Sequence, residues 1–198
     1  MHNNPELTVI DPLTKDLGDG PENIKVIKNW MPEEHIKTLL DYTLLSTGQR
    51  DLQSEMKYQK AFYDRELAKS YEHLMRAEAT RLYGREFKRD TTVDFNGRRE
   101  EVGEHTDFIE PQFYDPLVPK NPAHYDYGWS GHLSIIVYLN DDFEGGEIVF
   151  PQHDISIKPE AGLFIAFPGN VNYKHLVNSF SGNKRCTISL WTRFKDFR

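Results

Sequence analysis

The sequence predicts a single domain that is mostly β, with two supporting α-helices near its N-terminus. Two amphipathic segments lie in the first half of the chain, and after Gly84 the sequence changes to short extended segments separated by turn residues. With 198 residues, 38% of them hydrophobic, the chain is long enough for one compact core and shows no sign of a second. We therefore expect an antiparallel sandwich or barrel with helices packed against it.

The composition indicates which binding partners and which cellular compartment to expect for this protein. The formal net charge is −7, and acidic and basic residues are interleaved along the chain, so a nucleic acid is not the expected partner. Cys186 is the only cysteine, which excludes an internal disulfide and is typical of a reducing compartment. Residues 1–5 show no signal-peptide pattern, and no apolar run is long enough to span a membrane. We expect a cytoplasmic protein without a membrane partner, and the oligomeric state is left open.

Three regions are expected within the one domain of residues 1–198. Residues 1–22 are rich in Pro, Gly and Asp and have no sustained period, so they are expected to be an arm laid over the domain or a disordered segment. Residues 23–90 are expected to hold a strand and the supporting helices. Residues 91–198 are expected to form the β-rich core.

The expected elements follow from periodicity and from turn residues. A short strand at 24–27 precedes a helix that begins at Pro32, and a second helix covers about 64–82. The apolar stripe of the second helix is expected at Leu67, Tyr71, Leu74 and Leu82. Strands of the core are expected at 91–95, 133–139, 147–150, 154–157, 163–167 and 185–194.

Two of these strands alternate strongly enough to assign their faces. The apolar faces are Leu133, Ile135, Val137 and Leu139 in one strand, and Cys186, Ile188 and Leu190 in the other. The opposite faces are His132, Ser134, Ile136 and Tyr138, and Arg185, Thr187, Ser189 and Trp191. Each strand thus offers an apolar face to the helices and a partly polar face to the interior of a barrel that binds a small charged molecule.

A metal site is the first chemical hypothesis. His105 and Asp107 lie two positions apart, so they project to the same side of an extended segment and can share one metal ion. The His-x-Asp pattern alone is weak, because a surface histidine beside an acid is common. His175 is a third candidate ligand, since it follows a Pro-Gly turn and precedes the last strand. Two imidazoles and one carboxylate on one face of iron leave positions open for a cosubstrate and O₂.

An anion site is the second hypothesis. Arg185 opens the last strand with its side chain on the polar face, and a buried guanidinium needs an anion. Its planar fork can hold the distal carboxylate of 2-oxoglutarate in a bidentate manner. Tyr138 and Ser189 lie on polar faces, where their hydroxyls could donate to the same carboxylate. The alternative for Arg185 is an ordinary surface salt bridge.

Several short motifs occur in order through the second half of the chain. They are His105-x-Asp107, Tyr138-Leu139-Asn140, Gly145-Gly146-Glu147, Ile157-x-Pro159, Gly162, Phe167-Pro168, His175 and Gly182-x-x-Arg185, ending at Trp191. In this combination the sequence resembles the prolyl 4-hydroxylase-like family of Fe(II)/2-oxoglutarate-dependent dioxygenases. The resemblance spans nearly half of the chain and implies a double-stranded β-helix, or jelly roll, with iron at its open end.

The resemblance implies a hydroxylase that uses Fe(II), 2-oxoglutarate and O₂ and releases succinate and CO₂, with ascorbate as a candidate reductant. It implies His105, Asp107 and His175 as the iron ligands. A prolyl residue in a polypeptide is the first choice of substrate, and a free amino acid or another small molecule is the alternative. Two rivals are a non-catalytic jelly-roll module that binds or senses a ligand, and a cupin-like metalloenzyme without 2-oxoglutarate. The three ligands together with Arg185 argue against both rivals.

Two features depart from the family pattern. The family often has a tyrosine ten positions before the first histidine, close to the cosubstrate, where this sequence has Phe95. Residues 108–130 look longer than in compact family members and are rich in aromatic residues and proline, so they are expected to form a substrate-binding wall or a loop packed on the domain. Tyr127, Trp129 and His132 are the candidate substrate residues.

The other histidines are not expected to bind the metal. His35, His73, His124 and His153 are expected at the surface rather than at the metal. His132 is expected at the mouth of the pocket, because it begins its strand in the wrong place for the family's third ligand. Residues 48–63 are either a lid over the site or a plain connector.

Overall fold

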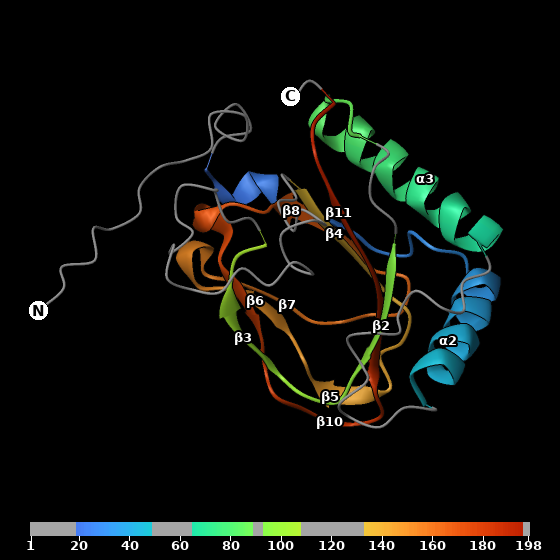
Figure 1. Cartoon of the computed structure of the whole chain (residues 1–198). Helices are drawn as coiled ribbons and strands as arrows, with labels where there is room; N and C mark the ends of the chain where they lie inside the picture. The colour runs from blue at the N-terminus through green and yellow to red at the C-terminus, as the bar shows by residue number, and fades with distance from the viewer. Residues whose placement is uncertain (1–18, 49–64, 89–92, 108–132, 196–198) are drawn as a thin grey trace, which may run out of the picture.

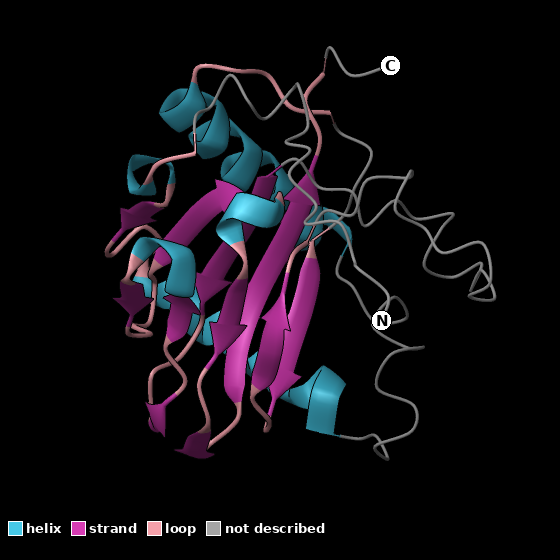
Figure 2. Cartoon of the chain, turned by 90° about the vertical axis from the view of Figure 1, so that its left-hand side faces the viewer, coloured by secondary structure: helices cyan, strands magenta, loops and turns pink. Residues whose placement is uncertain are grey.

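The fold is seen in a computed structural model, which describes residues 19–48, 65–88, 93–107 and 133–195. A five-stranded and a four-stranded antiparallel sheet form the body of the structure, and a pair of helices covers the outer face of the larger sheet (Figure 1). Figure 2 shows the strands of this β-rich body with the helices around it. The predicted combination of a β core and N-terminal helical support is confirmed.

The larger sheet has five strands in the order β1-β8-β4-β11-β2, and all neighbours are antiparallel. They are β1 (Lys25–Ile27), β2 (Asp94–Arg98), β4 (Leu133–Tyr138), β8 (Phe164–Pro168) and β11 (Arg185–Thr192). The central strand, β4, is rich in β-branched residues and is almost entirely buried between β8 and β11. The inner face of β4 and β11 carries Ser134, Tyr138 and Arg185, which belong to the site described below.

The smaller sheet has the order β3-β9-β6-β7. Its strands are β3 (Val102–His105), β6 (Ile148–Phe150), β7 (Ile155–Ile157) and β9 (His175–Val177). A separate hairpin-like pair joins β5 (Phe143–Gly145) to β10 (Phe180–Gly182). Gly145 has a φ of 84°, and a Cβ added there would lie 2.4 Å from the Ser179 carbonyl oxygen, so only glycine fits this position.

The helices are α2 (Glu33–Gly48) and α3 (Arg65–Tyr83), close to the predicted bounds. Three short 3₁₀ helices complete the described elements: η1 (Pro21–Asn23), η3 (Pro151–His153) and η4 (Val171–Tyr173). On α3 the buried stripe runs through Tyr71, Met75 and Ala79, at a spacing of four residues. The expectation that Leu74 belongs to this stripe is wrong, because the helix turns it outward and it is 47% exposed.

Two clusters of buried residues lie on opposite faces of the larger sheet. The cluster beneath the helices contains the apolar faces predicted for β4 and β11, together with residues of α2 and α3 such as Leu39 and Met75. The second cluster lies between the sheets and includes Tyr138, with Ile136 packed against it. The predicted assignment of the two faces is therefore confirmed for both strands.

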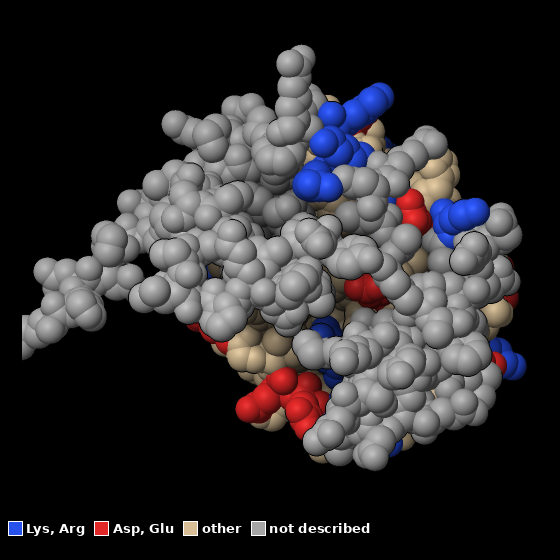
Figure 3. Space-filling model, in the orientation of Figure 1, with Lys and Arg blue, Asp and Glu red and all other residues tan. Residues whose placement is uncertain are grey.

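Several expectations fall on residues that the structure does not describe. They concern residues 1–18 of the arm, most of the 48–63 segment, the 108–130 segment with Tyr127 and Trp129, and the histidines His124 and His132. Among the described helices, none is both long enough and apolar enough to cross a membrane. Figure 3 shows charged side chains of both signs on the visible face, in keeping with the interleaved charges of the sequence. The single-domain organisation and the cytoplasmic location stay predictions.

Packing of α3 on the sheet generates a stability prediction. Met75→Ala removes a fully buried side chain from the cluster beneath the helices and should lower the free energy of unfolding by about 2–5 kcal/mol. Leu74→Ala, one residue away on the exposed side, should change it by less than about 0.5 kcal/mol. Urea denaturation of both variants measures the difference. Equal losses in the two variants would contradict this docking of the helix.

Candidate metal centre

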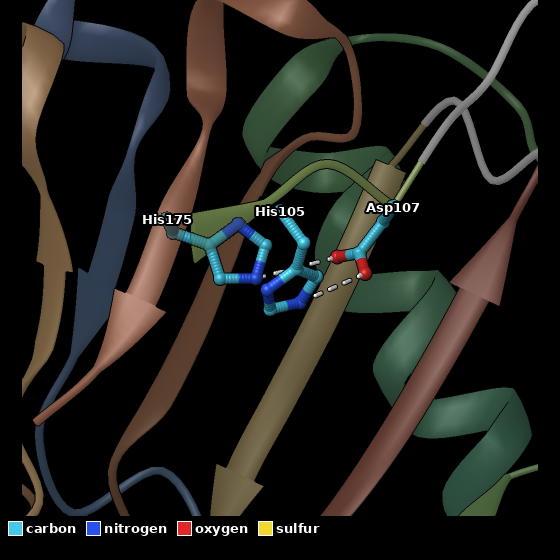
Figure 4. Close-up of side chains that lie close together, drawn as sticks. All are labelled: His105, Asp107 and His175. Atoms are coloured by element: carbon cyan, nitrogen blue, oxygen red, sulfur yellow. Dashed lines mark ion pairs between the residues drawn. The ribbon is translucent and has the colours of Figure 1, made fainter. Parts of the chain in front are cut away.

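Pairing between β3 and β9 brings the first two candidate ligands together. His105 is the last residue of β3, His175 is the first residue of β9, and the two are direct partners in the antiparallel ladder. Side chains of directly opposed residues project to the same face, and the two imidazole rings have centroids 4.3 Å apart. Asp107 follows two residues after His105, and its carboxylate points toward both rings (Figure 4).

The three side chains have the spacing of a metal site. Asp107 Oδ1 lies 3.8 Å from His105 Nε2, and Asp107 Oδ2 lies 3.7 Å from His175 Nε2. One ligand atom from each residue lies within 4.8 Å of the others. Ligand atoms that each sit roughly 2.1 Å from an ion are about 3–4 Å apart. The group predicted from sequence is therefore assembled in the fold, in an arrangement that an ion would draw slightly closer.

Hydrogen bonds orient the ligand atoms toward this point. His105 Nδ1 lies 2.7 Å from the Gly103 carbonyl oxygen, and His175 Nδ1 lies 3.1 Å from the Tyr173 carbonyl oxygen. Because a carbonyl only accepts, each Nδ1 carries the proton and each Nε2 presents its lone pair to the centre. Asp107 Oδ2 in turn accepts a hydrogen bond of 2.6 Å from Ser134 Oγ, a partner that the sequence did not reveal.

The candidate metal centre is buried on the His175 side and exposed to solvent on the His105 side. The rings of Phe150 and Phe167 pack against His175, which is 3% exposed, whereas the side chain of His105 is 37% exposed. Burial lowers the pKa of His175 below its ordinary value, with His105 and Arg185 acting in the same direction and Asp107 opposing them. His175 is therefore neutral at pH 7, which is the form that binds a metal.

A buried arginine lies on the inner face of the larger sheet. Arg185 is 5% exposed, and its Nη2 donates a hydrogen bond of 2.9 Å to the hydroxyl of the fully buried Tyr138. Within the described part of the chain, Arg185 has no carboxylate partner and its Nε has no hydrogen-bond partner. A buried guanidinium without an anion is costly, so this pair fits a ligand that brings a carboxylate. Arg185 and Tyr138 therefore lie next to each other on the inner face of the sheet, as the sequence predicted.

The matches to known families identify the chain. The family model described as the 2OG-Fe(II) oxygenase superfamily matches residues 92–193. The chain belongs to this superfamily. The match covers His105, Asp107, His175 and Arg185, so the metal centre and the anion site both lie within it.

Curated relatives are similar over part of the chain. Human prolyl 3-hydroxylase 2 is 41% identical over 63 residues, which is 29% of this chain and 9% of that protein. Human prolyl 3-hydroxylase 3 is 32% identical over 78 residues, which is 36% of this chain and 10% of that protein. The chain thus spans about a tenth of the length of the curated relatives it matches.

Solved structures support the fold of this superfamily member. The 2OG complex of the viral collagen prolyl hydroxylase from Paramecium Bursaria Chlorella virus-1 matches with a TM-score of 0.60 at 17% identity, covering 86% of this chain and 96% of that one. A prolyl-4-hydroxylase from Pseudomonas putida matches with a TM-score of 0.60 at 14% identity, covering 92% and 90%. The predicted double-stranded β-helix is confirmed.

Membership of the superfamily sets the cofactors. They are Fe(II) and 2-oxoglutarate, with O₂ as the second cosubstrate, as predicted. Two imidazoles and one carboxylate suit Fe(II), and the buried Arg185 suits the distal carboxylate of 2-oxoglutarate. Ascorbate as reductant and the individual roles of these residues stay predictions.

Strand β2 corrects one expectation about the pocket of this oxygenase. Phe95 pairs with Ile188 and lies in the cluster beneath the helices, so it faces away from the site rather than toward the cosubstrate. Asn96 projects from the opposite face instead, and its Nδ2 donates to Ser189 Oγ at 3.3 Å. Thr187 lies between Asn96 and Tyr138 as the direct partner of both. Asn96 is thus an interior-facing polar residue that sequence reasoning missed, whereas Thr187 lies on the polar face that the sequence predicted for its strand.

Other candidates occupy different places. Ser189 lies on the same face as Arg185 but four residues farther along β11, roughly 13 Å at the usual rise of a strand, so its role in cosubstrate binding stays a prediction. His35 and His73 are exposed on α2 and α3, as predicted. His153 is half-buried, stacks on the ring of Tyr173 and hydrogen-bonds the Asn172 carbonyl oxygen through Nε2.

Metal binding is directly testable. His105→Ala, Asp107→Ala and His175→Ala each remove one of three ligands, so each should weaken Co(II) or anaerobic Fe(II) binding beyond the roughly 10- to 100-fold effect of losing an outer partner. Calorimetric titration of metal-stripped protein measures the affinity. His73→Ala on the exposed face of α3 is the control and should bind as the unmodified chain does. Normal affinity in His175→Ala would refute the assignment.

Proposed function

We propose that this chain is an Fe(II)- and 2-oxoglutarate-dependent hydroxylase that acts on a prolyl residue in a polypeptide. One observation carries the proposal: the His105, Asp107 and His175 group and a buried Arg185 that has no anion partner among the described residues occur within the same oxygenase fold. The first feature suits the metal, and the second suits the dicarboxylate cosubstrate.

The chain's own residues prepare the site for this chemistry. When bound, Fe(II) with 2-oxoglutarate and O₂ supplies an oxidant that inserts one oxygen atom into a C–H bond, with release of succinate and CO₂. Arg185 and Tyr138 would hold the far carboxylate of the cosubstrate, because the Tyr138 oxygen accepts from Arg185 and keeps its own proton free to donate. Phe150 and Phe167 exclude water behind His175, and the exposed side of His105 leaves an approach for the substrate.

The names of the relatives support a polypeptide substrate. The curated relatives are prolyl 3-hydroxylases, and one solved neighbour is a prolyl hydroxylase from Trichoplax adhaerens in complex with a peptide fragment of a hypoxia inducible factor. The solved structure from Pseudomonas putida is a prolyl-4-hydroxylase, so these names point to different ring carbons. We therefore propose the prolyl ring as the target, and leave the choice between C3 and C4 to the product analysis.

A product assay tests this proposal. The iron-loaded chain is incubated with 2-oxoglutarate, ascorbate and proline-containing peptides, and the peptides are examined by mass spectrometry for the gain of one oxygen atom. Matched peptides with alanine in place of proline, and free proline, are the controls. NMR of a hydroxylated peptide assigns the carbon. Oxygen gain by free proline alone would replace the peptide substrate with a small-molecule one, while absence of succinate under all conditions would refute the enzyme class.

Cosubstrate binding gives a second test. Arg185→Ala should raise the KM for 2-oxoglutarate by about 30-fold or more, because a buried carboxylate that loses its charged partner costs roughly 2–5 kcal/mol. The thermal shift produced by 2-oxoglutarate should disappear as well. The melting temperature without 2-oxoglutarate should not fall in parallel, since the variant no longer buries a guanidinium that lacks an anion partner in the described part of the chain.

The adjacent residue provides the matched control for that test. Lys184 is less buried than Arg185. It lies just before β11, the strand whose first residue is Arg185. Lys184→Ala should leave the KM for 2-oxoglutarate within about twofold, as expected for a charge near the surface. A large increase in KM for Lys184→Ala together with an unchanged value for Arg185→Ala would reverse the assignment.

A further inference from the structure

We propose that Ser134 is a positioning residue that holds the Asp107 carboxylate so that Oδ1 alone is presented to the metal. The Ser134 hydroxyl donates a 2.6 Å hydrogen bond to Asp107 Oδ2. That length is typical of a charge-assisted bond between a hydroxyl and a carboxylate. The inference rests on the metal centre of the proposed function and assigns its outer partner.

The strength of this contact comes from where Ser134 lies. It is 1% exposed on the central strand β4, and its backbone is paired on both sides, with Phe167 of β8 and with Trp191 of β11. A hydroxyl at such a position is costly to bury unless it has a partner, and Asp107 provides one. The donor is therefore held rigidly by the sheet.

Asp107 is held less firmly by its own backbone. It lies two residues beyond the end of β3, outside the ladder that fixes His105 opposite His175. The terminal torsion of an aspartate is broad, so the carboxylate can rotate unless a partner fixes it. The rigid hydroxyl of Ser134 thus orients the more mobile carboxylate.

Comparison of the three ligands shows why Ser134 is distinctive. His105 and His175 are oriented by backbone carbonyl oxygens, those of Gly103 and Tyr173. Within the residues that the structure describes, Ser134 is the only side chain that hydrogen-bonds any of the three. The orientation of the centre can therefore be altered by one substitution here without changing a ligand.

The hydrogen bond also affects how the carboxylate binds. A carboxylate can bind a metal through one oxygen or through both, and binding through both would use a position that 2-oxoglutarate or O₂ needs. Both oxygens face the centre, with Oδ1 3.8 Å from His105 Nε2 and Oδ2 3.7 Å from His175 Nε2. With Oδ2 engaged by Ser134, Oδ1 is the oxygen left to the metal. Ser134 thereby favours a centre that keeps its remaining positions open.

Metal binding without any turnover tests the role. The full chain is stripped of metal and titrated calorimetrically with Co(II), and loss of Co(II) to EDTA is followed in parallel. Ser134→Ala should weaken Co(II) binding by about 10- to 100-fold, the usual effect of removing an outer partner, and should speed the loss to EDTA. The visible absorption of bound Co(II) should also change, because the freed Oδ2 can then bind. Ser134→Thr keeps the hydroxyl and should restore most of the affinity.

Two further variants separate positioning from packing. Thr43→Ala removes a fully buried hydroxyl that donates to the Leu39 carbonyl oxygen within α2, so it should lower the melting temperature without changing Co(II) affinity. Ser134→Cys keeps nearly the same volume but donates weakly, so it should show the loss of affinity even if Ser134→Ala folds poorly.

The outcomes distinguish this inference from the proposed function. If Co(II) affinity and absorption were unchanged in both Ser134→Ala and Ser134→Cys, the role of Ser134 would be overturned. If Asp107→Ala lost Co(II) affinity in the same experiment, the assignment of the metal centre would still stand. Failure of the unmodified chain to bind Co(II) or Fe(II) would overturn the centre and the role of Ser134 together.

Discussion

The antiparallel pairing of His105 with His175 is the contact on which the metal centre depends, because it sets two ligands side by side from strands far apart in the sequence. Strand β9 is itself paired with β6, where Val177 lies opposite Ile148. Ile148 and Phe150 of β6 belong to the second buried cluster. The position of His175 therefore follows from the packing of the smaller sheet. Asp107 depends on the same pairing, since it extends from the strand that carries His105.

A buried positive charge is the second constraint on the fold. Arg185 lies on the inner face of β11, and its charge adds slightly to the lowering of the pKa of His175 that burial mainly causes. Burying Arg185 without a carboxylate partner in the described residues costs stability, and the compensating burial lies on the other face of the sheet, beneath α2 and α3. The helical layer and the polar interior are thus energetically linked through β4 and β11, which contribute residues to both.

Long regular patterns could be predicted from the sequence, whereas short or irregular ones could be predicted only in part. The faces of β4 and β11 alternate over six or more residues, and the helices and the metal ligands were predicted because their patterns are long or chemically distinctive. Strands β3, β5, β9 and β10 have three or four residues, too few to show a period, and they were missed. Strands β1, β6 and β7 are as short, but apolar residues between turn signals indicated them. Phe95, which stands where the family often has a tyrosine close to the cosubstrate, faces the helices instead, because Asp-Phe-Asn-Gly-Arg does not alternate and its register is set by β11. The bond between Ser134 and Asp107 joins distant segments, so no local pattern indicates it.

Strand β4 joins the two halves of the proposed chemistry. Ser134 and Tyr138 lie on its inner face four residues apart, so one strand orients the carboxylate ligand near one end and the anchor for 2-oxoglutarate near the other. Both hydroxyls are fully or almost fully buried, and each hydrogen-bonds a charged group. Because the outer face of β4 is packed beneath the helices, any shift of this strand would disturb the hydrophobic cluster there. The spacing between metal and cosubstrate anchor is therefore maintained by core packing on the opposite side of the sheet.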